Sequence, residues 1–267
     1  MKIIQIGVGP KRVPLVGYLQ DYVDDGGIKN IRPSVVICAG GAYRFLSWRE
    51  QDHVAMQFLA EGYNVFLLNY SVKEDAKGLN PLMEASDSLV KIREHGTEWL
   101  CDPNRIAILG FSAGGHVAAS LATLHGDARL QKAMPCEQGM NRPDACILCY
   151  PVITSGPFCH AETIEWVSGG DEKEKEYFCL EKQVTDDTPP CFIWHTVADP
   201  AVPVENSMLF ASALRAHKVP FELHLFQEGG HGLSTCDGEV NTPQEADHAW
   251  IALVMKWLEN QFDYSKL

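Results

Sequence analysis

Residues 105–124 read RIAILGFSAGGHVAASLATL, and they give the strongest indication of the fold. Its first seven residues are mostly apolar, which predicts a strand that is buried on both faces. From Ser112 onward alanine and leucine are frequent, which predicts a helix that ends near Leu124. A strand that passes directly into a helix must turn sharply at Ser112, and the glycines two residues to either side leave room for that turn. The serine is therefore expected in a strained conformation with its hydroxyl exposed.

Strand-like and helical segments alternate along the rest of the chain. Apolar runs of strand length occupy residues 34–39, 64–70, 145–150, 191–197 and 221–226. Helical segments occupy residues 47–60, a stretch that starts at 80, residues 204–216 and residues 243–262. Ser47 and Glu50 have the spacing of a capping box, and Pro81 stands in the first turn of the second helix. This order predicts the α/β class, with a mostly parallel sheet and helices on both of its faces.

The chain has 267 residues and shows neither an internal repeat nor a low-complexity linker. We therefore predict one domain over residues 1–267. A charged segment from about Ser155 to Gln183 interrupts the alternation. It is either a solvated excursion or a small lid over the site, and the sequence leaves both open.

Charge and composition exclude several classes of function. The 22 Lys and Arg residues against 35 Asp and Glu residues give a formal net charge of −13, so neither nucleic acid nor an anionic membrane is an expected partner. No apolar run approaches the roughly 18 residues that span a bilayer. The apolar run at the start of the sequence is interrupted by Gly7 and Gly9 and is too short for a signal peptide. Nine irregularly spaced cysteines do not resemble a disulfide framework, so we expect a cytoplasmic protein.

The turn at Ser112 presents a candidate nucleophile, although serine is also a favoured helix N-cap. A serine hydroxyl needs a base, and His231 lies in a glycine-rich loop directly after the strand 221–226. Asp199 follows the strand 191–197 and is the candidate for orienting the imidazole, although an aspartate before proline is also common in turns. Three other aspartates compete for that role: Asp186, Asp187 and Asp237.

An acyl-transfer site also needs amide donors for the oxyanion. One candidate donor is the amide of Ala113, next to the serine. The second candidate lies in the loop after the strand 34–39, where Gly41 and Ala42 allow the backbone to approach a substrate. The sequence does not separate these two, and a simple turn is the alternative. Four aromatic residues are candidates for lining the pocket: Tyr43, Phe45, Trp48 and Trp166.

Several motifs recur together in one known family. They include Gly40-Gly41-Ala42-Tyr43, Ser47-x-Arg49-Glu50, the stretches at 62–71 and 102–107, Gly110 through His116, His195-Thr196, Asp199 with Val202-Pro203, and Gly230-His231-Gly232. From about Val35 to Leu258 the chain resembles the bacterial carbohydrate-esterase-like α/β hydrolases, also called endo-xylanase-like or acetyl-xylan and feruloyl esterases. Ala42 departs from the pattern, because many members have a third glycine there.

The resemblance implies the α/β-hydrolase fold and short acyl groups, such as acetyl, on sugars as substrates. Acetylated xylo-oligosaccharides suit a cytoplasmic enzyme better than an intact polysaccharide. The chain order Ser112, Asp199, His231 is the order that this fold uses. The alternatives are a serine peptidase, a carboxylesterase for other esters, and a binding protein that has lost catalysis.

No signal for a cofactor or a metal accompanies these residues. Histidine and cysteine pairs with zinc spacing are missing from the sequence, and the glycines at positions 7 and 9 lack the rest of a dinucleotide motif. Cys146 and Cys149 have redox-type spacing, but residues three apart on a strand face opposite sides. We expect a small-molecule ester as the partner, and the sequence leaves the oligomeric state open.

Overall fold

The structure, a computed structural model, describes residues 1–265, and residues 245 and 246 are described by their backbone alone. One sheet runs through the molecule in the order β1-β2-β4-β3-β5-β6-β7-β8. Its strands are β1 (Lys2–Val8), β2 (Val13–Leu19), β3 (Arg32–Cys38), β4 (Asn64–Leu68), β5 (Cys101–Phe111), β6 (Ala145–Cys149), β7 (Cys191–Thr196) and β8 (Phe221–Phe226).

Helices connect these strands. The α-helices are α1 (Asp52–Ala60), α2 (Asn80–Glu94), α3 (Gly96–Trp99), α4 (Ala113–Leu124), α5 (Ala128–Ala133), α6 (Ala161–Ser168), α7 (Glu172–Tyr177), α8 (Glu205–Ala216) and α9 (Glu245–Phe262). Short 3-10 helices lie at η1 (Trp48–Glu50), η2 (Lys73–Ala76) and η3 (Leu180–Lys182).

The predicted mostly parallel sheet is confirmed. Neighbouring strands from β3 to β8 pair in parallel, whereas β1 and β2 form an antiparallel hairpin that also joins β4 in antiparallel fashion. The chain passes from β3 to β4 on one side and returns to β5 on the other side of β3. Open α/β sheets place their sites outside the carboxyl ends of the strands at such a reversal. The loops after β3 and β5 therefore meet where a site is expected.

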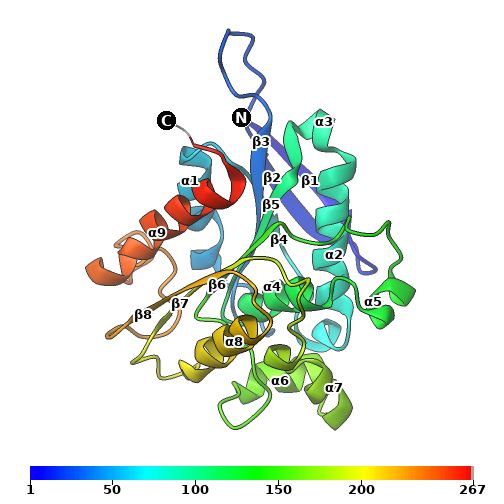
Figure 1. The fold of residues 1–267 in the computed structure, drawn as a ribbon, viewed down its shortest axis with the longest axis vertical. Helices are drawn as coiled ribbons and strands as arrows, with labels where there is room; N and C mark the ends of the chain where they lie inside the picture. The colour runs from blue at the N-terminus through cyan, green and yellow to red at the C-terminus, as the bar shows by residue number, and fades with distance from the viewer. Residues whose placement is uncertain (266–267) are drawn as a thin grey trace.

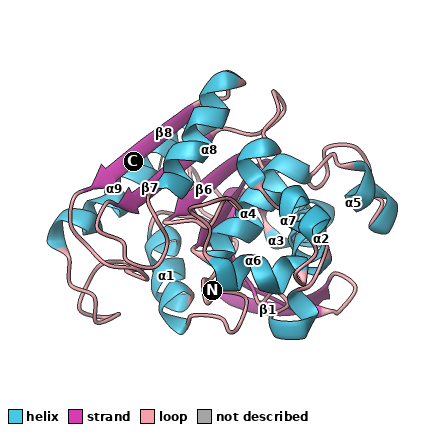
Figure 2. Ribbon diagram, turned by 90° about the horizontal axis from the view of Figure 1, so that it is seen from below, coloured by secondary structure: helices cyan, strands magenta, loops and turns pink. Residues whose placement is uncertain are grey.

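The core has two layers because every central strand is buried on both faces. Val36 and Ile108 face α2, α4 and α8, whereas Val35 and Leu109 face α1 and α9. Figure 1 shows α1 and α9 together on one side of the sheet and α2 and α4 on the other. Figure 2, seen from below, shows α4, α6 and α2 gathered on the same side of the molecule.

The structure departs from the sequence analysis in one missed element and one wrong prediction. The N-terminal hairpin of β1 and β2 was not predicted, because its alternation is weak and its turn lacks a two-residue signal such as Asn-Gly. The capping box at Ser47 is wrong. Ser47 makes no side-chain cap bond, a 3-10 turn stands in place of the first helical turn, and the Glu50 carboxylate bonds to the amide of Gly40 instead.

The interrupting segment from about 155 to 183 contains α6, α7 and η3. Its helices begin with side-chain caps from His160 and Asp171. Val167 and Phe178 are buried in the same apolar cluster as α2 and α4. The segment therefore packs against the body of the molecule and carries its charges on the outside.

All nine cysteines are free thiols, and seven of them are buried. Cys146 lies in the cluster beneath α4 and Cys149 lies in the cluster beneath α9, so the two face opposite sides of the sheet as predicted. No helix in residues 1–265 combines the length and the apolar character that a bilayer crossing requires.

A buried glutamate on α2 makes stability depend on pH. The Glu84 carboxylate accepts hydrogen bonds from the amide and the hydroxyl of Ser71. Burial raises the pKa of Glu84 to about 7, although the bonds from Ser71 oppose the shift. Because the pKa is raised only in the folded state, the folded protein binds the Glu84 proton more tightly than the unfolded chain does. The stability gained from this proton is complete below pH 4.5, the ordinary pKa, and is lost as the pH rises through about 7.

We expect Glu84→Gln to remove this pH dependence, because glutamine does not ionise. As the pH rises from acidic to neutral, the parent should lose up to about 3 kcal/mol of unfolding free energy that the variant does not lose. Urea unfolding of both proteins across that range measures the difference. A difference that stays constant with pH would contradict the assignment.

Candidate active site

Ser112 lies at the tight turn between β5 and α4. Its φ of 53° and ψ of −117° fall in a region that non-glycine residues rarely adopt, and its amide donates to the carbonyl of Cys149 at 3.0 Å. A Cβ on Gly114 would lie 2.1 Å from the carbonyl oxygen of Cys38, so only glycine fits. The serine side chain makes no capping bond to the helix, which argues against the N-cap alternative.

His231 reaches this serine from the loop after β8. The Nε2 atom of His231 lies 2.8 Å from Ser112 Oγ, and the Nδ1 atom lies 2.7 Å from Oδ2 of Asp199. Because the carboxylate only accepts, Nδ1 carries the proton and Nε2 accepts from the serine hydroxyl. The serine, the imidazole and the carboxylate thus form one chain of hydrogen bonds.

Asp199 lies after β7 and accepts from four donors. Oδ1 accepts from the amides of Ala201 and Val202 at 2.9 and 3.0 Å. Oδ2 accepts from His231 and also lies 3.3 Å from Nε2 of His195. Burial alone raises the pKa of Asp199, but the hydrogen bonds from His195 and His231 outweigh it and hold the pKa well below its usual value. The carboxylate is therefore ionised at any pH near neutral.

The competing aspartates lie elsewhere. Asp186 bonds to His217, and Asp187 bonds to His125. Asp237 accepts from the amides of Glu239 and Val240 in a surface turn. None of the three bonds to His231 in the described chain.

The loop after β3 passes next to Ser112. A Cβ on Gly40 would lie 3.0 Å from Cβ of Ser112, and a Cβ on Gly41 would lie 2.0 Å from the carbonyl oxygen of Phe45. Gly41 has a φ of 131°, and Ala42 follows with a φ of 55°. Gly41, Ala42 and Ser112 line one cavity.

That cavity has a volume of about 240 Å³ and a polar lining. Its lining residues are Gly41, Ala42, Arg44, Phe45, Ser47, Arg49, Glu50, Ser112, His160, Glu162, His231 and Gly232. At its rim, Arg44 and Glu162 form an ion pair of 3.3 Å between the loop after β3 and α6. The cavity therefore joins four segments that lie apart in the sequence: residues 41–50, Ser112, residues 160–162 and residues 231–232.

Three of the four aromatic residues predicted to line the pocket do not line this cavity. Tyr43 turns inward and is buried, because its hydroxyl bonds to His116. Trp48 points to the surface beside His53. Trp166 packs against the core beneath α4. Phe45 is the exception and lines the cavity while half exposed.

His116, one turn beyond Ser112, connects two segments to α4. Its Nδ1 atom accepts from the Tyr43 hydroxyl at 2.9 Å, and its Nε2 atom donates to the carbonyl of Phe178 at 3.2 Å. Burial lowers the pKa of His116 to about 4. The ring is therefore neutral. A neutral ring is also what the hydrogen bonds require, because one ring nitrogen accepts and the other donates.

Sequence reasoning missed three polar residues around the site. Glu50 and His160 line the cavity, and the Tyr150 ring packs edge-on against His231 with 5.1 Å between ring centroids. Burial, followed by the nearby His231, lowers the pKa of His160. Tyr150 directly follows β6, so its place at the carboxyl end of a strand was the signal that could have identified it.

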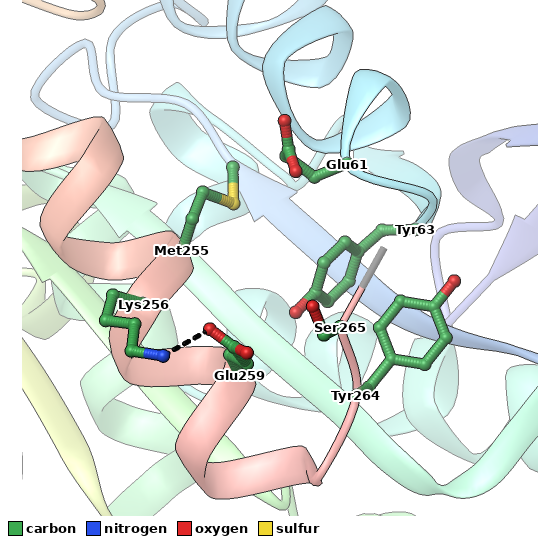
Figure 3. Close-up of a pocket in the computed structure, with 7 residues that line it drawn as sticks. All are labelled: Glu61, Tyr63, Met255, Lys256, Glu259, Tyr264 and Ser265. Carbon is green, nitrogen blue, oxygen red and sulfur yellow. Dashed lines mark hydrogen bonds and ion pairs between the residues drawn. The ribbon is translucent and has the colours of Figure 1, made fainter. Parts of the chain in front are cut away.

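Figure 3 shows another cavity, of about 180 Å³, between the end of α1 and the last turns of α9. Tyr63 and Tyr264 pack edge-on there, and Lys256 pairs with Glu259. Its lining residues include a serine, Ser265, but no histidine. It lacks the serine–imidazole pair of the cavity at Ser112. Nor do the described residues bring three or more His, Cys, Asp or Glu side chains into a group that could hold a metal ion.

Comparison with known proteins agrees with this geometry. The endo-1,4-β-xylanase B of Butyrivibrio fibrisolvens is 39% identical over 223 residues, which cover 82% of this chain and 35% of that protein. Across its curated relatives, the chain spans between 35% and 55% of their length. The matches therefore cover only part of those proteins.

Two solved structures match over nearly their whole length. The acetyl ester-xyloside bifunctional hydrolase of Caldicellulosiruptor lactoaceticus has a TM-score of 0.80 and 34% identity, and the match covers 94% of this chain and 89% of that chain. The carboxylesterase Cest-2923 of Lactobacillus plantarum has a TM-score of 0.87 and 26% identity, with 98% of both chains covered. Both confirm the predicted α/β-hydrolase fold.

The family model of the prolyl oligopeptidase family matches residues 53–265. That span contains Ser112, Asp199 and His231 in the order that α/β hydrolases use. The resemblance to esterase-like α/β hydrolases is thus confirmed at the level of the family. The chain belongs to the prolyl oligopeptidase family of α/β hydrolases.

Proposed function

We propose that the protein is a serine esterase that removes short acyl groups, such as acetyl, from soluble xylo-oligosaccharides. The observation that carries this proposal is the continuous hydrogen-bonded chain from Ser112 Oγ through His231 to Asp199 at the edge of a small polar cavity. This arrangement supplies a nucleophile, a base and an orienting carboxylate for acyl transfer.

The reaction runs in two halves. Ser112 Oγ attacks the ester carbonyl while its proton passes to Nε2 of His231, and the amides of Ala113 and of Gly41 or Ala42 hold the oxyanion. The imidazolium then protonates the departing alcohol, which leaves an acyl group on Ser112. Water then attacks the acyl carbon while its proton passes to His231, and the imidazolium returns that proton to Ser112 Oγ as the acid leaves.

The cavity lining supports a short acyl group and a hydroxyl-rich alcohol. The lining includes the charged side chains of Arg44, Arg49 and Glu162, and Phe45 is its one large apolar side chain. Polar groups of this kind bind hydroxyls, whereas a long fatty acyl chain would need a continuous apolar channel. The acetyl ester-xyloside hydrolase with which the chain shares 34% identity supports the same class of substrate.

A panel of substrates tests the proposal. We expect the parent protein to hydrolyse 4-nitrophenyl acetate and acetylated xylo-oligosaccharides faster than feruloyl esters, long-chain esters, 4-nitrophenyl xyloside or peptide amides. Release of acetate and of nitrophenol measures the rates under one set of conditions. Glycoside hydrolysis requires a pair of carboxylates placed to act as acid and base, whereas the Glu50 carboxylate is buried and accepts from Gly40 and Tyr150.

Three results would overturn parts of the proposal. A preference for peptide amides would favour the peptidase alternative that the family name suggests. A preference for esters without sugar would leave a general carboxylesterase. Failure of a fluorophosphonate to label Ser112 would favour a binding protein that has lost catalysis.

A further inference from the structure

The buried side chain of Glu50 lines the cavity and belongs to no step of the proposed reaction. Its side chain is 2% exposed. Oε2 accepts from the amide of Gly40 at 2.7 Å, and Oε1 bonds to the Tyr150 hydroxyl at 2.7 Å. A Cβ on Gly40 would lie within 2.7 Å of the carboxylate and 3.0 Å of Ser112 Cβ. The carboxylate thus supports the loop that passes directly beside the nucleophile.

Tyr150 extends this contact to the loop that carries His231. The Tyr150 hydroxyl accepts from the amide of Ser234 at 2.8 Å, so its own proton is free to donate to Glu50. Ser234 lies three residues beyond His231, and its hydroxyl donates to the carbonyl of Arg49, next to Glu50. The Tyr150 ring also packs edge-on against the His231 ring. Two separate contacts therefore join η1, which contains Glu50, to the loop that carries His231: the bonds through the Tyr150 hydroxyl and the bond from Ser234 to Arg49.

The hydrogen bonds favour the ionised form of this group. Glu50 accepts at both oxygens, which is the pattern of an ionised carboxylate. Burial raises the pKa of Glu50, and the hydrogen bonds from Tyr150 and Gly40 and the nearby His231 oppose the rise. Because each oxygen already accepts from a protein donor and the side chain is 2% exposed, we assign Glu50 no proton exchange with a substrate.

We propose that Glu50 is a positioning residue: through Gly40 and Tyr150 it holds the loop of the oxyanion donors and the loop of His231 at a fixed separation around Ser112. The inference rests on the proposed acyl transfer. Small displacements of reacting groups can lower rates by about 100-fold, so a rigid link between these two loops has a large effect on kcat.

Glu50 also acts on His231 through its charge. Asp199, Ser112 and the Tyr150 ring contact the His231 ring, and His160 and Glu50 interact with it electrostatically. Asp199 and Glu50 are the two carboxylates in this set. The negative charge of Glu50 stabilises the imidazolium that forms during the reaction.

Two conservative variants test the proposal with a short-chain 4-nitrophenyl ester. We expect Glu50→Gln and Tyr150→Phe each to lower kcat by roughly 10- to 100-fold and to change KM little. In Glu50→Gln, the acid limb of the pH profile of kcat/KM should move to lower pH, because loss of the negative charge makes the imidazolium less stable. Tyr150→Phe keeps the charge, so its acid limb should stay in place.

Glu84→Gln is the matched control, because Glu84 is also a buried glutamate that accepts two hydrogen bonds, but it lies on α2 outside the cavity. It should leave kcat and the acid limb unchanged. Circular dichroism and thermal unfolding establish that each variant is folded. If Glu50→Gln does not fold, Tyr150→Phe still tests the link between the loops.

The outcomes separate this inference from the proposed function. A parent protein that neither reacts with a fluorophosphonate nor hydrolyses esters refutes the proposed function. An active parent with folded variants that keep the parental kcat refutes the positioning role. A lowered kcat with an unmoved acid limb in Glu50→Gln refutes the action of its charge on His231.

Discussion

Ser112→Ala is expected to lower kcat/KM for short-chain esters by at least about 10⁴-fold. The hydroxyl lies 2.8 Å from Nε2 of His231, and alanine removes both the attacking oxygen and the proton that the imidazole accepts. The remaining activity would come from substrate binding and the oxyanion donors. Initial rates with 4-nitrophenyl acetate and mass spectrometry of the fluorophosphonate adduct measure the loss.

Ser120→Ala is the matched control for this variant. Ser120 lies on the same helix, α4, and is 2% exposed, comparable to the 7% of Ser112. It lies outside the cavity, so its replacement should leave both the rate and the labelling intact. Hydrolysis by Ser112→Ala at the parental rate would refute the assignment of the nucleophile.

Asp199→Asn is expected to lower kcat by about 10⁴-fold while the protein remains folded. Asp199 accepts from four donors, and asparagine has only one accepting oxygen. If that oxygen stays on the amides of Ala201 and Val202, the NH₂ group faces His231 Nδ1. The imidazole then carries its proton on Nε2, which points to Ser112 and is no longer able to accept the serine proton.

Asp187→Asn is the control for this second variant. Asp187 also accepts from a histidine, at 3.0 Å from Nε2 of His125, but it lies outside the cavity of Ser112. Its kcat should equal that of the parent. A small effect of Asp199→Asn, comparable to that control, would show that Asp199 does not orient the base.

The fold was predictable where local patterns are strong. Continuous apolar runs located β3 to β8, and the glycines around Ser112 located the turn from β5 into α4, because both signals act within a few residues. The β1–β2 hairpin was missed because its alternation is weak and its turn lacks a two-residue signal, and because β4, which joins it to the rest of the sheet, lies about fifty residues away in the sequence.

The site was predictable only in part, for the same reason. Ser112, Asp199 and His231 each follow a strand, so topology alone brings them to one edge of the sheet. The role of Glu50 was misread, since the spacing to Ser47 matched a capping box while the actual partners, Gly40 and Tyr150, come from distant segments. The orientation of aromatic side chains likewise depends on tertiary contacts, as the bond from Tyr43 to His116 shows.

The burial of the thiols has a consequence for chemical durability. Cys38, Cys146 and Cys149 are fully buried, and burial raises the pKa of each thiol far above its ordinary value. Oxidants and alkylating agents attack the thiolate, so these sulfurs serve as small apolar atoms that such reagents do not reach in the folded state. These three buried thiols are thus compatible with oxidising as well as reducing surroundings as long as the core stays closed, whereas Cys136 and Cys159 are partly exposed.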